Sequence, residues 1–185
     1  MTTTYISSPR LLFREWKEED KEELFAAASD REIGPMAGWQ PHRSVEESLS
    51  IIKTILSEEN TFAIIEKESG KIIGSVGLFP PVEKIVKKDK DELEVGYWIA
   101  KPKWGRGYAT ESVKRMLEYA FETLKINKVW CGAFIENTRS IRVQEKCGFV
   151  FSHIEEIHVS PLNQNKTERF SYIDRETWEK NKQQF

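Results

Sequence analysis

The stretch KPKWGRGYATES, residues 101–112, carries the residues best suited to chemistry in this sequence. Gly105 and Gly107 lack side chains, so the backbone can turn there and point successive N–H groups outward. The apolar pattern that follows predicts a helix beginning at this turn. Unsatisfied N–H groups and the macrodipole at a helix start bind anions, and a pyrophosphate fits, with Arg106 or Lys103 adding charge. An ordinary tight turn before a helix would show the same spacing.

Two common phosphate-binding motifs do not fit this stretch. A dinucleotide fingerprint needs a third glycine or alanine at position 110, where Thr110 lies, and an acidic residue about 20 positions further on. Residues 124–128 read LKINK and contain no acid. A P-loop needs Gly-Lys followed by Ser or Thr, which the sequence lacks. We therefore exclude both motifs.

The elements that must position the turn follow from hydrophobic periodicity. We expect strands at 11–16, 61–65, 72–79, 93–100, 128–135, 149–159 and 167–173. We expect helices at 18–30, 45–56, 109–124 and 137–146, with a short helical tail near Trp178. Ser44 and Glu47 fit a capping box that opens the second helix. Loops are expected at 31–43 and at 82–92, where Lys87, Lys88 and Lys90 are balanced by nearby acids. This order predicts a mixed α/β fold in one domain.

Composition and charge exclude several classes of protein. The 185 residues include 39% hydrophobic and 31% charged residues, and the net charge of −2 argues against a nucleic-acid or membrane partner. No apolar run approaches the ~20 residues that span a bilayer, and the N-terminus offers no signal-peptide core. Cys131 and Cys147 form no CxxC pair, and the three histidines have no metal-binding spacing. We expect a soluble cytoplasmic protein without a metal.

Two longer stretches carry a family resemblance. LEVGYWIAKPKWGRGYATESVKRMLEYAF (93–121) and IENTRSIRVQEKCGFV (135–150) resemble the GNAT superfamily of acyl-CoA-dependent N-acetyltransferases. The more specific similarity is to the Rim-type branch, which acetylates the N-termini of ribosomal proteins. The resemblance implies a single domain over residues 1–185, with a mixed, largely antiparallel central sheet flanked by helices. It also implies acetyl-CoA as the co-substrate.

The resemblance places the cofactor on two motifs. The family's pyrophosphate motif, Gln/Arg-x-x-Gly-x-Gly/Ala, begins here at Trp104, which departs from the usual first residue. The pantetheine arm would pair with the strand before the turn, where a free N–H could also polarise the thioester carbonyl. The implied cofactor-binding residues are Trp98, Ile99, Ala100, Trp104, Gly105, Arg106, Gly107, Tyr108, Ala109, Thr110, Asn137 and Ser140.

The resemblance also suggests catalytic residues. Glu94 matches a family glutamate that often acts as the base, although an ordinary exposed carboxylate would look the same. Ser140 would protonate the leaving sulfur, a modest contribution because a thiol with a pKa of ~8.5 departs readily as thiolate. Asn137 and Ser140 also fit a plain helix start. Trp39 and Glu94 are expected to border the acceptor.

These expectations combine into an acetyl-CoA-dependent N-acetyltransferase acting on a primary amine. The N-terminal α-amine of a protein such as a ribosomal protein is the favoured acceptor, because the motifs offer Glu94 as a base and no second candidate close to it. A polyamine or aminoglycoside acetyltransferase is one alternative. A non-catalytic acyl-CoA-binding module is another. The protein would act as a monomer or a homodimer.

Overall fold

Eight strands form where β-branched and aromatic residues concentrate. The computed structural model describes residues 6–81 and 91–182. Its strands are β1 (Ile6–Ser7), β2 (Leu11–Arg14), β3 (Thr61–Glu66), β4 (Ile72–Phe79), β5 (Glu92–Ile99), β6 (Lys128–Phe134), β7 (Val150–Val159) and β8 (Gln164–Asp174). They belong to one sheet in the order β1-β2-β3-β4-β5-β6-β8-β7. Among the pairs with a described register, only β5 with β6 is parallel, so the mixed, largely antiparallel sheet is confirmed.

The helices follow the expected order, and the structure adds one helix and one strand that were not expected. They are α1 (Lys21–Ala28), α2 (Gly34–Ala37), α3 (Val45–Ile51), α4 (Tyr108–Glu118), α5 (Thr138–Lys146) and α6 (Arg175–Asn181). The short α2 lies in a segment expected to be a loop, and β1 was not expected at all. Both α3 and α4 continue into a π-helical turn, at Ile52–Leu56 and Tyr119–Thr123. Most of the charged loop expected at 82–92, including Lys87, Lys88 and Lys90, lies outside the described residues.

The start of α3 confirms half of the expected capping box. The Glu47 N–H donates to Ser44 Oγ at 3.1 Å, as a helix cap requires. The carboxylate of Glu47, however, accepts from the N–H and the guanidinium of Arg43. The Glu47 carboxylate pairs with Arg43 because the charge of the guanidinium strengthens this hydrogen bond.

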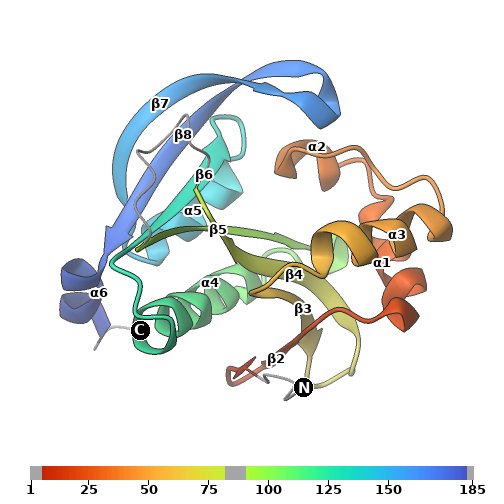
Figure 1. Cartoon of the computed structure of the whole chain (residues 1–185), viewed down its shortest axis with the longest axis horizontal. Coiled ribbons are helices and arrows are strands. Elements are labelled where there is room, and N and C mark those ends of the chain that lie inside the picture. Colours follow the sequence, from red (N-terminus) through yellow and green to blue (C-terminus); the bar gives the residue numbers. More distant parts are fainter. Residues whose placement is uncertain (1–5, 82–90, 183–185) are drawn as a thin grey trace. The chain divides into compact units, whose positions relative to one another are not determined.

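By its contacts the chain forms two compact units, and each is described separately. The first unit comprises Met1–Gly77 and Tyr97–Ser112. Its core packs apolar residues of α1 and the π-helical turn after α3 against β3 and β4, and α1 contacts α3 directly (Figure 1). The core residues are Trp16, Leu24, Ala28, Ile52, Ala63, Ile65 and Ile72.

The second unit comprises Leu78–Gly96 and Val113–Phe185. The apolar stripe of the helix after the glycine turn is buried as expected, at Val113, Met116, Leu117, Ala120 and Phe121. In α6, Trp178 packs on Phe121 with ring centroids 5.1 Å apart, which fixes the helical tail. The strands β7 and β8 form a long curved hairpin, drawn in blue in Figure 1.

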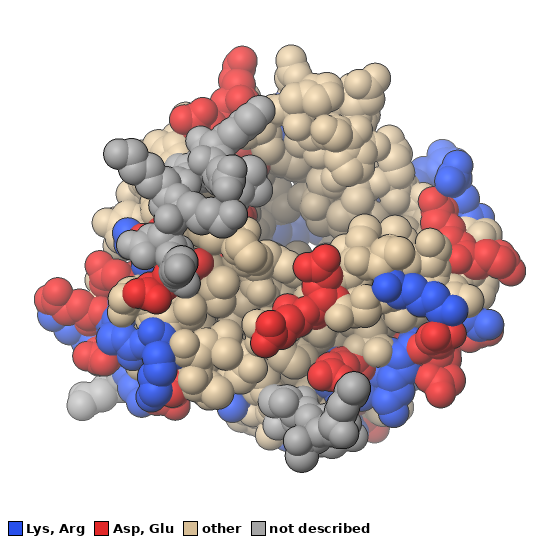
Figure 2. Space-filling model, in the orientation of Figure 1, with Lys and Arg blue, Asp and Glu red and all other residues tan. Residues whose placement is uncertain are grey.

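On the face drawn in Figure 2, basic side chains lie among acidic ones, in keeping with the net charge of −2. Within residues 6–81 and 91–182, no helix is both long and apolar enough to span a bilayer.

Candidate active site

The glycine turn has the backbone geometry that its sequence predicts. Gly105 and Gly107 adopt φ values of 74° and 79°, a region that residues with a Cβ rarely enter. A Cβ at Gly105 would meet nothing within 4 Å, so conformation rather than crowding requires glycine there. The Glu111 N–H donates to the Gly107 carbonyl at 3.0 Å, so α4 begins directly after the turn. The first N–H groups of a helix have no acceptor within it, and here they follow the turn immediately.

The tryptophan that departs from the family motif has a structural hydrogen bond. Trp104 Nε1 donates to the Ile99 carbonyl at 2.7 Å, which ties the turn to the end of β5. Lys101–Lys103 form a 3₁₀ turn between the two. The indole thus connects two parts of the predicted cofactor site.

The end of β5 limits which strand N–H could be free. Ala100 donates its N–H to the Ile73 carbonyl at 2.8 Å. The Trp98 carbonyl also faces β4, because a Cβ on Gly74 would collide with it. Successive residues of a strand direct their N–H groups to opposite edges, so Ile99 faces the other edge.

Trp39 and Trp98 lie together in the first unit. Their ring centroids are 6.1 Å apart in an edge-to-face arrangement, and the His42 ring lies tilted against Trp39 with centroids 5.3 Å apart. A Cβ on Gly34 would lie 2.7 Å from the Trp39 ring, so the short helix α2 needs glycine there. Burial lowers the pKa of His42, although the nearby Glu47 carboxylate opposes the shift. These contacts place an aromatic surface beside the predicted cofactor strand.

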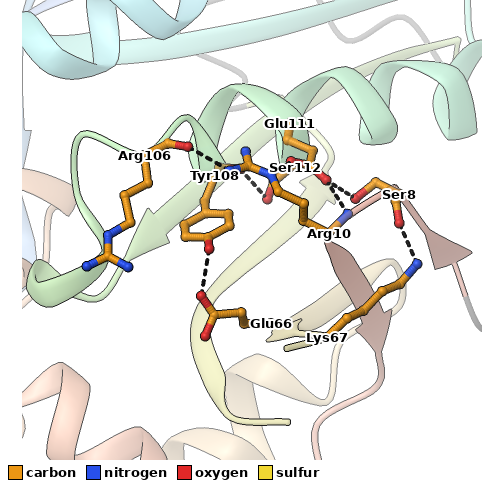
Figure 3. A network of polar contacts seen from close by, with 8 residues as sticks. All are labelled: Ser8, Arg10, Glu66, Lys67, Arg106, Tyr108, Glu111 and Ser112. Carbon is orange, nitrogen blue, oxygen red and sulfur yellow. Dashed lines mark hydrogen bonds and ion pairs between the residues drawn. The ribbon is translucent and has the colours of Figure 1, made fainter. Parts of the chain in front are cut away.

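A polar network that sequence reasoning missed surrounds the turn (Figure 3). The Glu66 carboxylate accepts from Lys103 Nζ and from the Tyr108 hydroxyl, each at 2.6 Å. The Glu111 carboxylate accepts from Arg10 Nε at 2.7 Å. Arg10 immediately precedes β2 and Glu66 ends β3. Both are far from the motif in the sequence, so no local signal could have found them.

The cations of the turn have different surroundings. Lys103 pairs with Glu66, and that ion pair is the largest cause that lowers the pKa of Glu66 to about 2. Arg106 contributes its carbonyl to the network, as acceptor from Arg10 Nη1 at 2.9 Å. Its guanidinium points away from the other labelled residues in Figure 3. Of the two basic side chains expected to add charge, Lys103 is already neutralised.

In the second unit, Glu94 is enclosed rather than simply exposed. The register of β5 with β6 ends, among the described residues, at Glu94 opposite Trp130. Burial raises the pKa of Glu94, while a hydrogen bond from the Gly132 N–H opposes the shift. The next acid, Glu92, instead pairs with Lys128 at 3.0 Å. The alternative of an ordinary exposed carboxylate is therefore not supported.

A second carboxylate, that of Glu168 on β8, lies beside Gly132 and close to Glu94. A Cβ on Gly132 would collide with Glu168 Oε1, so glycine makes room for this side chain over β6. Burial, followed by the negative charge of Glu94, raises the pKa of Glu168 to about 7. The motifs could not reveal this second acid, because the pairing of β6 with β8 brings in a residue remote from them.

The start of α5 shows Asn137 acting as a helix cap. Its Oδ1 accepts the Ser140 N–H at 3.2 Å. This is the plain role that either residue type can fill. The cap fixes both residues at the beginning of one helix, and their predicted roles toward a cofactor stay predictions. Within the described parts of the chain, no three His, Cys, Asp or Glu side chains gather into a group that could hold a metal.

The raised pKa of Glu168 has a consequence for stability. The folded state holds the proton up to about pH 7, whereas the model value for a free glutamate is 4.5. The free energy of unfolding should therefore fall as pH rises from about 5 to 8. Glu168→Gln should flatten this dependence and add on the order of 1–2 kcal/mol at pH 8, allowing for solvent around a half-buried group.

Urea unfolding at several pH values measures this effect. Glu155→Gln is the matched control, because Glu155 pairs with Glu168 across β7 and β8 but is exposed. An unchanged pH dependence in Glu168→Gln would show that this carboxyl titrates normally.

Known proteins resemble the chain in sequence and in fold. Residues 10–150 match the family model described as an acetyltransferase (GNAT) domain. An uncharacterized N-acetyltransferase, p20, from Bacillus licheniformis is 30% identical over 154 residues, which cover 80% of this chain and 83% of p20. YdaF of Bacillus subtilis, whose name proposes ribosomal N-acetylation, is 42% identical over 59 residues, or 32% of each chain.

A solved structure extends the similarity to the fold. The spermidine N-acetyltransferase of Vibrio cholerae, solved with CoA and spermine, superposes with a TM-score of 0.74 at 20% identity and covers 92% of this chain and 99% of its own. At that identity it shows the fold alone. Because the family model covers most of the sequence, the chain belongs to the GNAT family of acetyltransferases, which transfer the acetyl group of acetyl-CoA to an amine.

Proposed function

We propose that this enzyme acetylates the N-terminal α-amine of a protein, such as a ribosomal protein, as in the Rim-type branch. The observation that carries the proposal is the pair of carboxylates at Gly132, formed by Glu94 and Glu168. The pKa of Glu168, about 7, suits a base that works near neutral pH, and burial raises the pKa of Glu94 as well. Both cysteines are buried thiols, and a cytoplasmic location is part of the proposal.

The cofactor-binding residues form the second part of the proposal. Acetyl-CoA supplies an activated acetyl thioester and carries a pyrophosphate. The N–H groups of the turn and the first turn of α4 would bind that pyrophosphate, with Arg106 as the adjacent cation. The outer edge of β5 at Ile99 would pair with the pantetheine arm. Asn137 would contact the cofactor through the amide nitrogen of its side chain, because its oxygen caps α5.

Proton transfer is assigned to three side chains. Glu94 and Glu168 take the proton from the acceptor's ammonium group, either directly or through water, so that a neutral amine can attack. Ser140 donates a proton to the departing sulfur. The Ser140 contribution is the smaller one, because a thiol with a pKa of ~8.5 leaves readily as the thiolate near neutral pH.

The pKa of the base discriminates between acceptors. An α-amine has a pKa of ~7.7–8.0, so passing its proton to a carboxylate of pKa about 7 costs about 1 kcal/mol. A lysine or polyamine ammonium near ~10.4 would cost about 4.6 kcal/mol on the same scale. A buried site can lower the acceptor's own pKa, which narrows the difference between the two acceptors. The pair is therefore better matched to an α-amine.

A polyamine acceptor is the alternative with a specific observation behind it. Two adjacent carboxylates attract a polycation, and the V. cholerae spermidine enzyme shares this fold. The charge argument favours binding, whereas the pKa argument favours proton transfer. A non-catalytic acyl-CoA module is less compatible with a family of enzymes. Release of free CoA in the presence of an amine tests that alternative directly.

Gly107→Asp should abolish acetyl-CoA binding measured by calorimetry. The new carboxylate would repel the pyrophosphate, and the added Cβ would lie 3.5 Å from Arg10 Nη2. The matched control is Gly70→Asp, because Gly70 also has a positive φ, of 69°, but lies in the hairpin turn after β3. Both variants place a Cβ at a positive φ, and only Gly107→Asp should lose binding. Full affinity in a folded Gly107→Asp protein would remove the turn from the cofactor site.

Glu94→Gln and Ser140→Ala should lower kcat more than they raise the KM for acetyl-CoA. General acid–base groups contribute ~10²–10⁴-fold, with Ser140 at or below the low end. Because Glu168 can substitute for Glu94, the double variant Glu94→Gln/Glu168→Gln should lose more than either single change. Wild-type turnover from pH 6 to 9 in all of these variants would exclude the carboxylates and Ser140 from proton transfer.

Peptides with free N-termini should exceed spermidine and aminoglycosides in kcat/KM. A turnover screen with the three acceptor classes measures this, and peptides blocked at the α-amine but with free lysines are the control. Blocking should silence the peptides, because only the α-amine pKa suits the base. Turnover that survives the block, or a clear preference for spermidine, would overturn the acceptor assignment and leave the fold and the cofactor site intact.

A further inference from the structure

Glu66 is a buried carboxylate at the end of β3 whose hydrogen bonds converge on the glycine turn. Only 3% of the residue is exposed. It accepts from Lys103 Nζ, Ser69 Oγ and the Tyr108 hydroxyl, each at 2.6 Å. These three donors lower its pKa to about 2, with Lys103 the largest cause, so Glu66 is ionised at any working pH.

Two of the donors lie on opposite sides of the glycines. Lys103 precedes Gly105, and Tyr108 follows Gly107, so one carboxylate connects both ends of the turn to β3. Glu66 is itself fixed by the β3–β4 hairpin, where its carbonyl accepts the Gly70 N–H at 2.8 Å. The turn is thus anchored to a rigid part of the sheet and not only to its own helix.

Arg10, the residue before β2, holds the same turn as well. The guanidinium of Arg10 lies 4.4 Å from the centre of the Tyr108 ring and donates to the Arg106 carbonyl at 2.9 Å. Glu111 orients Arg10 by accepting from its Nε and its backbone N–H (Figure 3). Tyr108 is therefore fixed at both its hydroxyl group and its ring.

A turn with two glycines would otherwise be costly to order. Glycine loses more conformational freedom on ordering than any other residue, and a ligand that had to order the turn would bind more weakly. Contacts that order the turn during folding remove this cost from binding. Gly105 and Gly107 have no side chains to make such contacts, so the residues beside them, Lys103 and Tyr108, must make them.

We propose that Glu66 is a positioning residue that holds the cofactor turn in its binding conformation through Lys103 and Tyr108. This inference rests on the proposed assignment of the turn to acetyl-CoA. Glu66 does not touch the cofactor in this scheme, and as an anion it would repel phosphate if its charge were not paired. Glu66 therefore raises the affinity for acetyl-CoA, whereas its negative charge alone would lower it.

That opposition makes Glu66→Gln a decisive variant. Loss of the carboxylate releases the turn, and it also frees the Lys103 ammonium beside the proposed phosphate site. Positioning predicts that the Kd and KM for acetyl-CoA rise about 10-fold, in line with the loss of charge-assisted hydrogen bonds. Charge alone predicts that they fall. At saturating acetyl-CoA kcat should stay near wild type, because the cofactor itself then orders the turn.

Tyr108→Phe and Ser69→Ala are the matched pair of variants. Each removes one hydroxyl donor to the same carboxylate and changes no charge. Tyr108→Phe keeps the ring under Arg10 but releases the turn, so it should raise the Kd about 3- to 10-fold. Ser69→Ala leaves the turn attached and should leave the Kd unchanged. Tyr108→Phe also keeps the test valid if Glu66→Gln fails to fold.

Hydrogen exchange gives a readout that general destabilisation would not reproduce. The amides of Lys103 and Trp104, which donate to the Ala100 and Lys101 carbonyls, should exchange faster in free Glu66→Gln and Tyr108→Phe, and saturating acetyl-CoA should restore their protection. Unchanged or tighter binding in Glu66→Gln, or equal losses in Tyr108→Phe and Ser69→Ala, would overturn the positioning role. If Gly107→Asp binds acetyl-CoA normally, the assignment of the turn fails. If Gly107→Asp loses binding while Glu66→Gln and Tyr108→Phe bind acetyl-CoA like the wild type, the turn is the cofactor site and only the positioning role is wrong.

Discussion

The carboxylate of Glu66 joins three parts of the first unit that are distant in the sequence. It receives a hydroxyl from the β3–β4 hairpin, an ammonium group from the segment after β5 and a phenol from the start of α4. A buried carboxylate is stable only when its oxygens are satisfied, so these donors and the acid constrain one another. The path of the backbone through Gly105 and Gly107 depends on these hydrogen bonds to Glu66. So does the direction in which α4 begins, and with it the N–H groups proposed to bind phosphate.

Carboxylates in the two units show how surroundings decide the chemistry of one residue type. Glu66 is held at a pKa of about 2 by an ammonium group and two hydroxyls. Glu168 reaches about 7 because burial and the neighbouring charge of Glu94 both disfavour its ionised form. The first carboxylate cannot accept a proton at neutral pH and can serve only to hold structure. The second exchanges protons in the range where amines with a pKa near 8 react, so it suits catalysis.

The choice of acceptor reflects a balance between charge and proton affinity. A pair of carboxylates attracts any cation, and a polyamine carries more charge than a peptide N-terminus. If the pair became more exposed to solvent, the pKa values of its carboxylates would fall and the pair would be a weaker base. An α-amine needs little help to lose its proton, whereas a polyamine nitrogen needs a good deal. The fold alone does not separate these acceptors, because a spermidine enzyme shares it at 20% identity.

The sequence by itself determined the features that depend on local spacing. The strands, the long helix after the turn, the cap at Ser44 and the positive φ values at Gly105 and Gly107 all follow from residues close together in the chain. The family motif lies in the same short stretches. Glu94 could be named for the same reason, because it lies on the strand that leads into the turn.

Only the tertiary structure decided which distant residues complete the site. Arg10 and Glu66 reach the turn because β2 pairs with β3, and Glu168 reaches Glu94 because β8 pairs with β6. It also showed that Lys103 is neutralised and that the Ala100 N–H is already bonded. Nothing in the local sequence marks these residues, because the sequence around a charged residue looks the same whether its side chain faces water or a buried partner. Strand register places it, and strand register is a property of the whole sheet.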